Sequence, residues 1–206
     1  YTAMYVSTNG FITFGSAPST TNFTPISGNE SYAGAISAFG TDIENRSGFN
    51  TRTIRWETIG DEIIIQWKGL RRQGETENFD FQIRLNTATN AIVFVYGPRS
   101  TPDNATTFQP EVGLRGSSNL LLSNLNSRRV ESGSENWNTS LAGTSFGHKV
   151  RFTNASPAKS WTSGQTYTWT ACAPTVSVPP TPASYCPGGN VALTAPGATS
   201  YSWSPA

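Results

Sequence analysis

The chain has 206 residues, of which 13% are charged and 36% hydrophobic, and its formal net charge is +1. Soluble domains usually carry about 25% charged residues; here Ser, Thr, Asn and Gly fill the deficit, which favours strands and turns over surface helices. The near-neutral charge argues against nucleic acid or an acidic membrane as a partner, and no apolar run is long enough for membrane insertion.

Period-two alternation of apolar and polar residues predicts antiparallel hairpins along the first part of the chain. The clearest joins residues 5–8 to 11–14 around Asn9-Gly10, the dipeptide most typical of a tight hairpin turn. Two further hairpins are expected at 53–58 with 62–68 and at 79–85 with 91–96, and later strands at 111–115, 149–152 and 166–170. Residues 97–109 are polar and contain prolines, which predicts a surface loop.

The pattern is weaker between residues 117 and 147. Leu120, Leu121, Leu122 and Leu125 fit either a short buried strand or one helical turn before an Asn- and Ser-rich stretch. Both alternatives stay open at this point.

A domain boundary is expected near Cys172. Residues 172–184 contain four prolines, which predicts an extended and semi-rigid linker. Beyond it, residues 190–194 and 201–203 resemble two strands of a second sandwich, and two strands alone are only marginally stable. We therefore expect residues 185–206 to be the truncated start of another domain, and the chain to be part of a longer protein, since a strand is already under way at Tyr1.

Cys172 and Cys186 are the two cysteines of the chain and lie 14 positions apart. A disulfide between them would close a short loop in an oxidising compartment, stabilising it by roughly 3 kcal/mol in the chain-entropy model. The alternative is that Cys186 pairs with a cysteine further along the parent protein.

Several blocks of sequence resemble nidogen-like (NIDO-type) β-sandwich domains. They are VSTNGFITFG at 6–15, AISAFGTDI at 35–43, IQW at 65–67, FDFQIRL at 79–85, IVFVYG at 92–97 and VGLRG at 112–116. The details are most similar to versions in large secreted proteins of Bacteroidetes, and the tail resembles the start of Ig-like or PKD-like repeats. The resemblance implies a large antiparallel β-sandwich at 1–171 followed by an incomplete Ig-like β-sandwich. It also implies an extracellular or cell-surface location, reached through type IX secretion.

The sequence offers weak support for catalysis. His148 is the single histidine, and a Ser-His-Asp reading needs an acid and a nucleophile placed around it. The carboxylate pairs Asp42 with Glu44 and Asp61 with Glu62 lack the surroundings that mark a glycosidase acid. We therefore expect a non-catalytic module; an enzyme with unfamiliar residues is the competing hypothesis.

Calcium is the one cofactor for which the chain offers ligands. Asp42, Glu44 and Asn45 carry the oxygen atoms that calcium prefers, although no Asp-x-Asp-x-Asp-Gly loop is present. The alternative is that the Asp42 side chain accepts hydrogen bonds from buried backbone donors beside its strand.

Aromatic and basic residues are the candidate ligand contacts. Trp137 lies among Ser and Asn residues, as a loop-borne sugar or protein contact would, although the favoured interpretation is that it fills the core. Trp56 and Trp67 lie on the two strands of one predicted hairpin, so at least one is expected to enter the core. Arg128-Arg129 and Arg71-Arg72 suit a sulfated glycan or an acidic partner, or are solvated turns.

The leading hypothesis is an adhesive or structural module of a bacterial surface protein, for example in a fibre or stalk. Its partners would be a protein or glycan on a surface, or neighbouring subunits of the fibre. A carbohydrate-binding module is the alternative.

Overall fold

The computed structural model describes residues 3–44, 53–100, 107–108, 110–117, 126–129, 137, 141–143, 152–153 and 161–170. The chain divides into two units, Tyr1–Trp169 and Thr170–Ala206. The linker predicted at 172–184, the Ig-like start predicted at 185–206 and both cysteines lie outside the described residues. The described residues contain no α-helix. It follows that they include no helix of the length and hydrophobicity that crossing a membrane requires.

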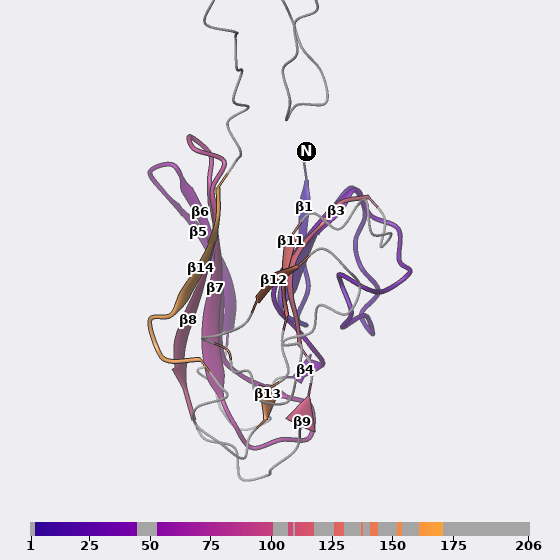
Figure 1. Cartoon of the computed structure of the whole chain (residues 1–206), viewed down its shortest axis with the longest axis vertical. Helices are drawn as coiled ribbons and strands as arrows, with labels where there is room; N and C mark the ends of the chain where they lie inside the picture. The colour runs from indigo at the N-terminus through magenta and orange to yellow at the C-terminus, as the bar shows by residue number, and fades with distance from the viewer. Residues whose placement is uncertain are drawn as a thin grey trace, which may run out of the picture. The chain divides into compact units, whose positions relative to one another are not determined.

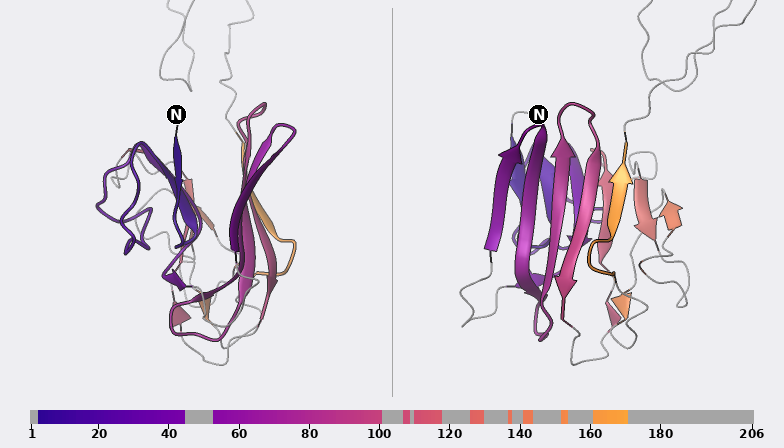
Figure 2. Two further views of the ribbon diagram at one scale, coloured as in Figure 1. Left: turned by 180° about the vertical axis from the view of Figure 1, so that it is seen from behind. Right: turned by 90° about the vertical axis from the view of Figure 1, so that its left-hand side faces the viewer.

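The first unit contains two antiparallel sheets that face each other as layers (Figures 1 and 2), which confirms the predicted all-β sandwich. The first sheet has the order β1 (Met4–Val6), β2 (Phe11–Phe14), β3 (Gly34–Gly40), β10 (Glu111–Arg115), β11 (Asn126–Arg129) and β12 (Leu141–Gly143). The second has the order β14 (Thr166–Trp169), β8 (Ile92–Arg99), β7 (Phe79–Asn86), β6 (Glu62–Arg72) and β4 (Ile43–Glu44), and β5 (Thr53–Ile59) also pairs with β6. A separate short pair joins β9 (Thr107–Phe108) to β13 (Phe152–Thr153).

The three predicted hairpins are present. The turn between β5 and β6 has two central residues, Gly60 and Asp61, and the positive φ of Gly60 (58°) at the first position fits a type II′ turn. The β1–β2 connection differs from the expected two-residue turn: Ser7 N–H donates to the Phe11 carbonyl, which leaves three residues in the loop. Gly10 ends that loop at φ 84°, where a left-handed residue is the usual solution for this loop length.

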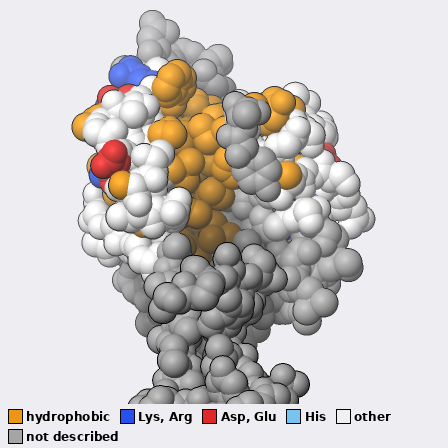
Figure 3. Space-filling view, turned by 90° about the horizontal axis from the view of Figure 1, so that it is seen from above, with side chains coloured by type: hydrophobic (Ala, Val, Ile, Leu, Met, Phe, Trp, Pro, Cys, Tyr) orange, Lys and Arg blue, Asp and Glu red, His pale blue; other side chains and the backbone are white. Residues whose placement is uncertain are grey.

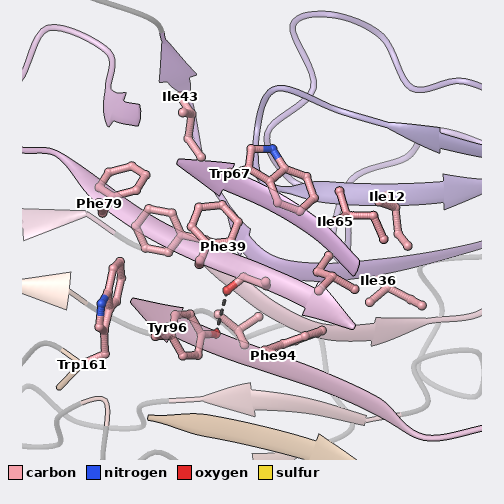
Figure 4. Close-up of a cluster of buried hydrophobic side chains, with 14 of the residues drawn as sticks. Ile12, Ile36, Phe39, Ile43, Ile65, Trp67, Phe79, Phe94, Tyr96 and Trp161 are labelled. Carbon is pink, nitrogen blue, oxygen red and sulfur yellow. Dashed lines mark hydrogen bonds between the residues drawn. The ribbon is translucent and has the colours of Figure 1, made fainter. Parts of the chain in front are cut away.

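The core lies between the two sheets and follows the period-two pattern of the strands. On the core-facing side of the second sheet, register places Ile65, Ile83 and Phe94 in one row, and Trp67, Phe81 and Tyr96 in the next. All six are buried, and they pack with Ile12, Ile36 and Phe39 of the first sheet (Figure 4). Because these side chains are large and almost wholly removed from water, their burial is the main force that holds the sheets together.

Two aromatic side chains of the second sheet also hydrogen-bond to the backbone of the first. The indole Nε1 of Trp67 donates to the carbonyl of Ser7 at 3.0 Å. The hydroxyl of Tyr96 donates to the carbonyl of Ala38 at 2.7 Å, the bond that is dashed in Figure 4. Ala38 lies where the β3–β10 register shifts, so its carbonyl needs a partner from outside the ladder. These bonds fix the two sheets relative to each other.

The outer face of the first sheet is covered by the loop that joins β2 to β3. Glu111 of β10 accepts hydrogen bonds from the backbone N–H of Ile26 at 2.7 Å and of Ser27 at 3.1 Å. Arg115 of the same strand donates to the carbonyl oxygens of Pro25, Gly28 and Glu30. Both charged side chains are buried; these partners engage the Glu111 carboxylate and the two terminal amino groups of Arg115, whereas Arg115 Nε has no hydrogen-bond partner among the described residues.

Four predicted loop positions belong to strands instead. One is β9, which lies inside the loop predicted at 97–109. β8 runs through Gly97 and Pro98 to Arg99, because the register with β7 shifts at this point and accommodates the proline. Arg71-Arg72 ends β6, and Arg128-Arg129 ends β11, so neither pair is a turn. Of the strand expected at 149–152, only Phe152 is described, and it belongs to β13. Leu120–Leu125 lie outside the described residues.

Candidate interaction surface

Strand β5 carries the most exposed large apolar side chain of the described residues. Trp56 is 71% exposed, although cross-strand pairing with Ile65 places it on the core-facing side of the sheet. Its neighbours Ile54 and Ile59 are also exposed, and the whole run from Ile54 to Ile59 is accessible to solvent. Trp67 on the neighbouring strand is fully buried, so one tryptophan of the hairpin enters the core, as predicted.

The outer face of the second sheet is polar and lies next to the same strand. Register places Arg55, Gln66 and Gln82 side by side across β5, β6 and β7. A shallow pocket of about 130 Å³ opens here, lined by Arg55, Trp56, Glu57, Ile64, Gln66 and Gln82. In contrast to the first sheet, this face presents amides and charges that can hydrogen-bond to a ligand.

Apolar side chains are also visible at one end of the sandwich. The space-filling view from above shows them between the two layers (Figure 3). The last core-facing row before the hairpin turns contains Ile63, Leu85 and Ile92, which are only half-buried. Apolar surface therefore continues from the core to that end of the molecule.

The predicted calcium ligands are only partly described. Glu44 forms an ion pair with Arg71 at 2.7 Å and accepts a hydrogen bond from the backbone N–H of Gly74. Asp42 is half-buried, its carbonyl accepts from the N–H of Gln73, and Asn45 lies outside the described residues. Since Arg71 already neutralises Glu44, this carboxylate is a poor start for a cation site. Among the described residues, no group of three or more His, Cys, Asp or Glu side chains is arranged to hold a metal.

The backbone donor beside Asp42 is taken by another residue. Asn9 Oδ1 accepts from the N–H of Ile43 at 3.1 Å, and Asn9 Nδ2 donates to the carbonyl of Asn22 at 2.7 Å. The asparagine of the first turn therefore connects three segments of the chain.

Trp137 is fully buried and packs in an aromatic cluster, which agrees with the favoured interpretation as a core residue and not with the ligand contact that its Ser- and Asn-rich context suggested. Its ring lies 5.1 Å from Tyr96 and 5.2 Å from Trp161, centroid to centroid, and the Tyr167 hydroxyl donates to its carbonyl. An indole in this position is not accessible to a sugar or to a protein surface.

The two basic pairs do not form a common anionic-ligand site in the described residues. Arg72 is buried and forms a bidentate ion pair with buried Glu77, through Nε to Oε1 and through an NH2 group to Oε2 at 3.2 Å. Arg128 and Arg129 belong to β11, whose side chains lie outside the described part, so their contact with a ligand stays a prediction.

The candidate catalytic groups are not brought together by the described part of the fold. Glu62 forms an ion pair with Arg84 at 3.6 Å, and Asp61 is exposed in the β5–β6 turn. His148 lies outside the described residues. Buried Glu77 and Glu111 have their oxygens engaged by structural donors, which leaves them unsuited to act as general acids.

The family model described as "NIDO related" matches residues 1–171. The chain belongs to this family. No curated protein and no solved structure matches the chain. The family assignment agrees with the resemblance seen in the sequence blocks, and its match spans the two sheets of this NIDO-related domain.

Sequence reasoning did not single out β5 as a candidate interaction surface of the NIDO-related domain. The signal that could have found it is the segment Thr53–Ile59, where apolar Ile54 and Trp56 alternate with Thr53, Arg55 and Glu57 in a strand of high β-propensity. Only the topology shows that this strand lies at an edge of its sheet, as far as the described strands go.

Proposed function

We propose that this NIDO-related domain is a non-catalytic extracellular module of a bacterial surface protein, with an adhesive or structural role. The observation that carries the proposal is the exposure of β5, where Trp56 is 71% exposed on a strand that pairs with β6 alone among the described residues. Tryptophan is enriched among the residues that dominate the energy of protein interfaces. An exposed strand edge adds a row of backbone donors and acceptors to such a contact.

The rest of the domain supports this role by rigidity. Two sheets joined through a large aromatic core hold β5 in a fixed place, and the loop held by Glu111 and Arg115 covers the opposite layer. Binding residues on a rigid scaffold lose little conformational entropy when a partner docks. The module therefore suits repeated presentation along a fibre or stalk at the cell surface.

Bead-binding assays test the proposal. Beads coated with the chain are measured for attachment to a panel of extracellular-matrix proteins and to beads coated with the same chain. We expect Trp56→Ser to reduce attachment at least tenfold, because about 1.4 kcal/mol of lost contact corresponds to that factor. Phe23→Ser is the matched control, since Phe23 is exposed on the loop over the other sheet. Equal attachment of the two variants would contradict the proposal.

A carbohydrate-binding module is the second candidate, and the pocket beside β5 favours it. Gln66 and Gln82 place two amides next to Arg55 and Glu57 on an open face, which is the kind of hydrogen-bonding group that orients a sugar. A glycan array probed with the wild-type chain and with Gln82→Ala separates the candidates. A glycan signal lost in Gln82→Ala and kept in Phe23→Ser supports sugar binding, and a blank array argues against it.

A further inference from the structure

Strand β5 has one open edge in the described part of the chain. It pairs with β6 from Thr53 opposite Lys68 to Ile59 opposite Glu62, and with no other described strand. The strand is seven residues long and contains no proline or glycine. Edges of this kind are templates for pairing with another strand unless a charge, a bulge or a cover protects them.

The turn defines which backbone groups point to the open edge. In an antiparallel ladder, alternate residues direct their N–H and C=O groups to the neighbouring strand, and the residues between direct theirs away from it. A two-residue turn is flanked by a hydrogen-bonded pair, which here is Ile59 with Glu62. Counting back in twos from Ile59, the residues bonded to β6 are Glu57, Arg55 and Thr53. The residues between them, Ile54, Trp56 and Thr58, therefore direct their backbone groups to the open edge.

The sequence of β5 is complementary to itself. When a second copy of the strand is laid antiparallel with Trp56 opposite Trp56, Arg55 of each copy lies opposite Glu57 of the other, and Ile54 lies opposite Thr58. Within their own domain, Arg55 and Glu57 pair across the ladder with uncharged Gln66 and Ile64. Both charges are exposed, neither forms an ion pair among the described residues, and across the open edge each would lie directly opposite a charge of the other sign.

The charges also select one register. Centring the pairing on Arg55 would place two arginines opposite each other, and centring it on Glu57 would place two glutamates opposite each other. Like charges directly opposite in a sheet are destabilising, whereas opposite charges and aromatic pairs are stabilising. The central Trp56 pair would in addition cover the most exposed indole of the described residues.

We propose that β5 is a homotypic docking edge, through which two copies of the chain pair β5 to β5 around Trp56 and join their second sheets into one. The contact is isologous, because the same strand serves on both sides of a two-fold axis. This inference rests on the proposed function of the domain as a protein-binding surface module, and it names the partner as a second copy.

Charge reversal tests the pairing in the full chain by sedimentation equilibrium. We expect the wild type to dimerise, and Glu57→Arg and Arg55→Glu each to weaken dimerisation at least tenfold, because each variant places like charges opposite each other twice. Mixing these two variants restores opposite charges at both positions, so the mixture is expected to form a heterodimer with wild-type affinity. The double variant Arg55→Glu/Glu57→Arg is expected to dimerise with itself.

Lys68→Glu is the matched control, since it reverses an exposed charge on the neighbouring strand and is expected to leave the dimer intact. Unchanged thermal melting of all variants shows that they fold. A monomeric wild type, or a dimer indifferent to Glu57→Arg, overturns the homotypic edge. The bead assay with matrix proteins does not depend on that result, so failure of self-pairing and failure of the adhesive function remain distinguishable.

Discussion

The hydroxyl of Tyr96 in β8 donates to the carbonyl of Ala38 in β3 at 2.7 Å, across the interface between the two sheets. Both residues are fully buried. The bond compensates for the register shift between β3 and β10, where the ladder cannot supply a donor to this carbonyl. Removing the hydroxyl leaves a buried acceptor without its partner.

We therefore expect Tyr96→Phe to lower the free energy of unfolding by about 1–3 kcal/mol, the cost of an unsatisfied buried polar group. The ring contacts with Trp137 and Trp161 are kept in this variant, so the hydrogen bond is the main loss. Urea denaturation measures the change. Tyr5→Phe, on the exposed strand β1, is the control and should fall within about 0.5 kcal/mol of the wild type. Equal stability of both variants would show that Ala38 finds another donor.

Gly10 is the glycine whose replacement is expected to be most damaging to the first hairpin. Its φ is 84°, and a Cβ atom added there would lie 2.2 Å from the Phe39 carbonyl oxygen. Since that carbonyl belongs to the backbone of β3, it cannot move without disturbing the sheet. Gly10→Ala should cost more than the roughly 1–2 kcal/mol of a left-handed alanine alone.

Gly60→Ala provides the comparison for Gly10→Ala, because Gly60 also has a positive φ, and a methyl group added to it would meet no atom within 4 Å. Thermal denaturation of the two variants separates two effects. Gly60→Ala reports the cost of a positive φ alone, and Gly10→Ala adds the steric clash with the Phe39 carbonyl oxygen. A Gly10→Ala protein no less stable than Gly60→Ala would mean that the β1–β2 turn can shift away from β3.

The buried ion pair between Arg72 and Glu77 should stabilise the folded protein through its bidentate hydrogen bonds as well as through its charges. Removing one partner of a buried pair typically costs about 3–5 kcal/mol, because the other charge is left without compensation. We expect Arg72→Met and Glu77→Gln each to be strongly destabilising, and the double variant to be less destabilised than the sum. A double-mutant cycle in urea measures this coupling.

The half-exposed pair of Glu62 with Arg84 is the control for that cycle, with an N–O distance of 3.6 Å. Its coupling energy should be about 0–1 kcal/mol, because solvent screens the charges. Couplings of equal size in the two cycles would contradict the structural role given to Arg72.

Because of Tyr32, we expect the folded protein to lose stability at alkaline pH. Burial raises the pKa of its phenol above the ordinary value of 10.0, while neighbouring Arg115 lowers it by a smaller amount. The unfolded chain therefore releases this proton at a lower pH than the folded chain does, so the free energy of unfolding falls as pH rises above about 10. In urea titrations between about pH 9 and 11, Tyr32→Phe should reduce this fall in the free energy of unfolding. The same fall in the variant as in the wild type would show that Tyr32 does not cause it.

The hairpins could be predicted from sequence because their signals are local. Gly60-Asp61 separates two alternating segments, and the strand at Glu111–Arg115 has the bounds that its sequence pattern predicts. The burial of Arg72 could not be predicted, because it depends on Glu77 folding back against the end of β6. A charged pair after an apolar strand is otherwise typical of a turn.

The candidate surface on β5 also depends on contacts between segments that are distant in the sequence. Trp56 and Trp67 lie on neighbouring strands, and register places both on the core-facing side of the sheet. Trp67 is buried because the first sheet lies against it, whereas Trp56 is exposed because β5 is the edge strand of the sheet in the described part of the chain. Alternation gives the face of a side chain, but the extent of the opposing layer is a tertiary property that no local pattern contains.

The loop held by Glu111 and Arg115 has a consequence for synthesis of the protein. Its backbone donors at Ile26 and Ser27 precede their acceptor by 85 and 84 residues. At ordinary translation rates of about 5–20 residues per second, roughly 4–17 s pass before β10 emerges to hold the loop. During that interval β3 can pair with β2, but the edge of β3 that later pairs with β10 is open, and the nascent chain exposes unpaired backbone groups there.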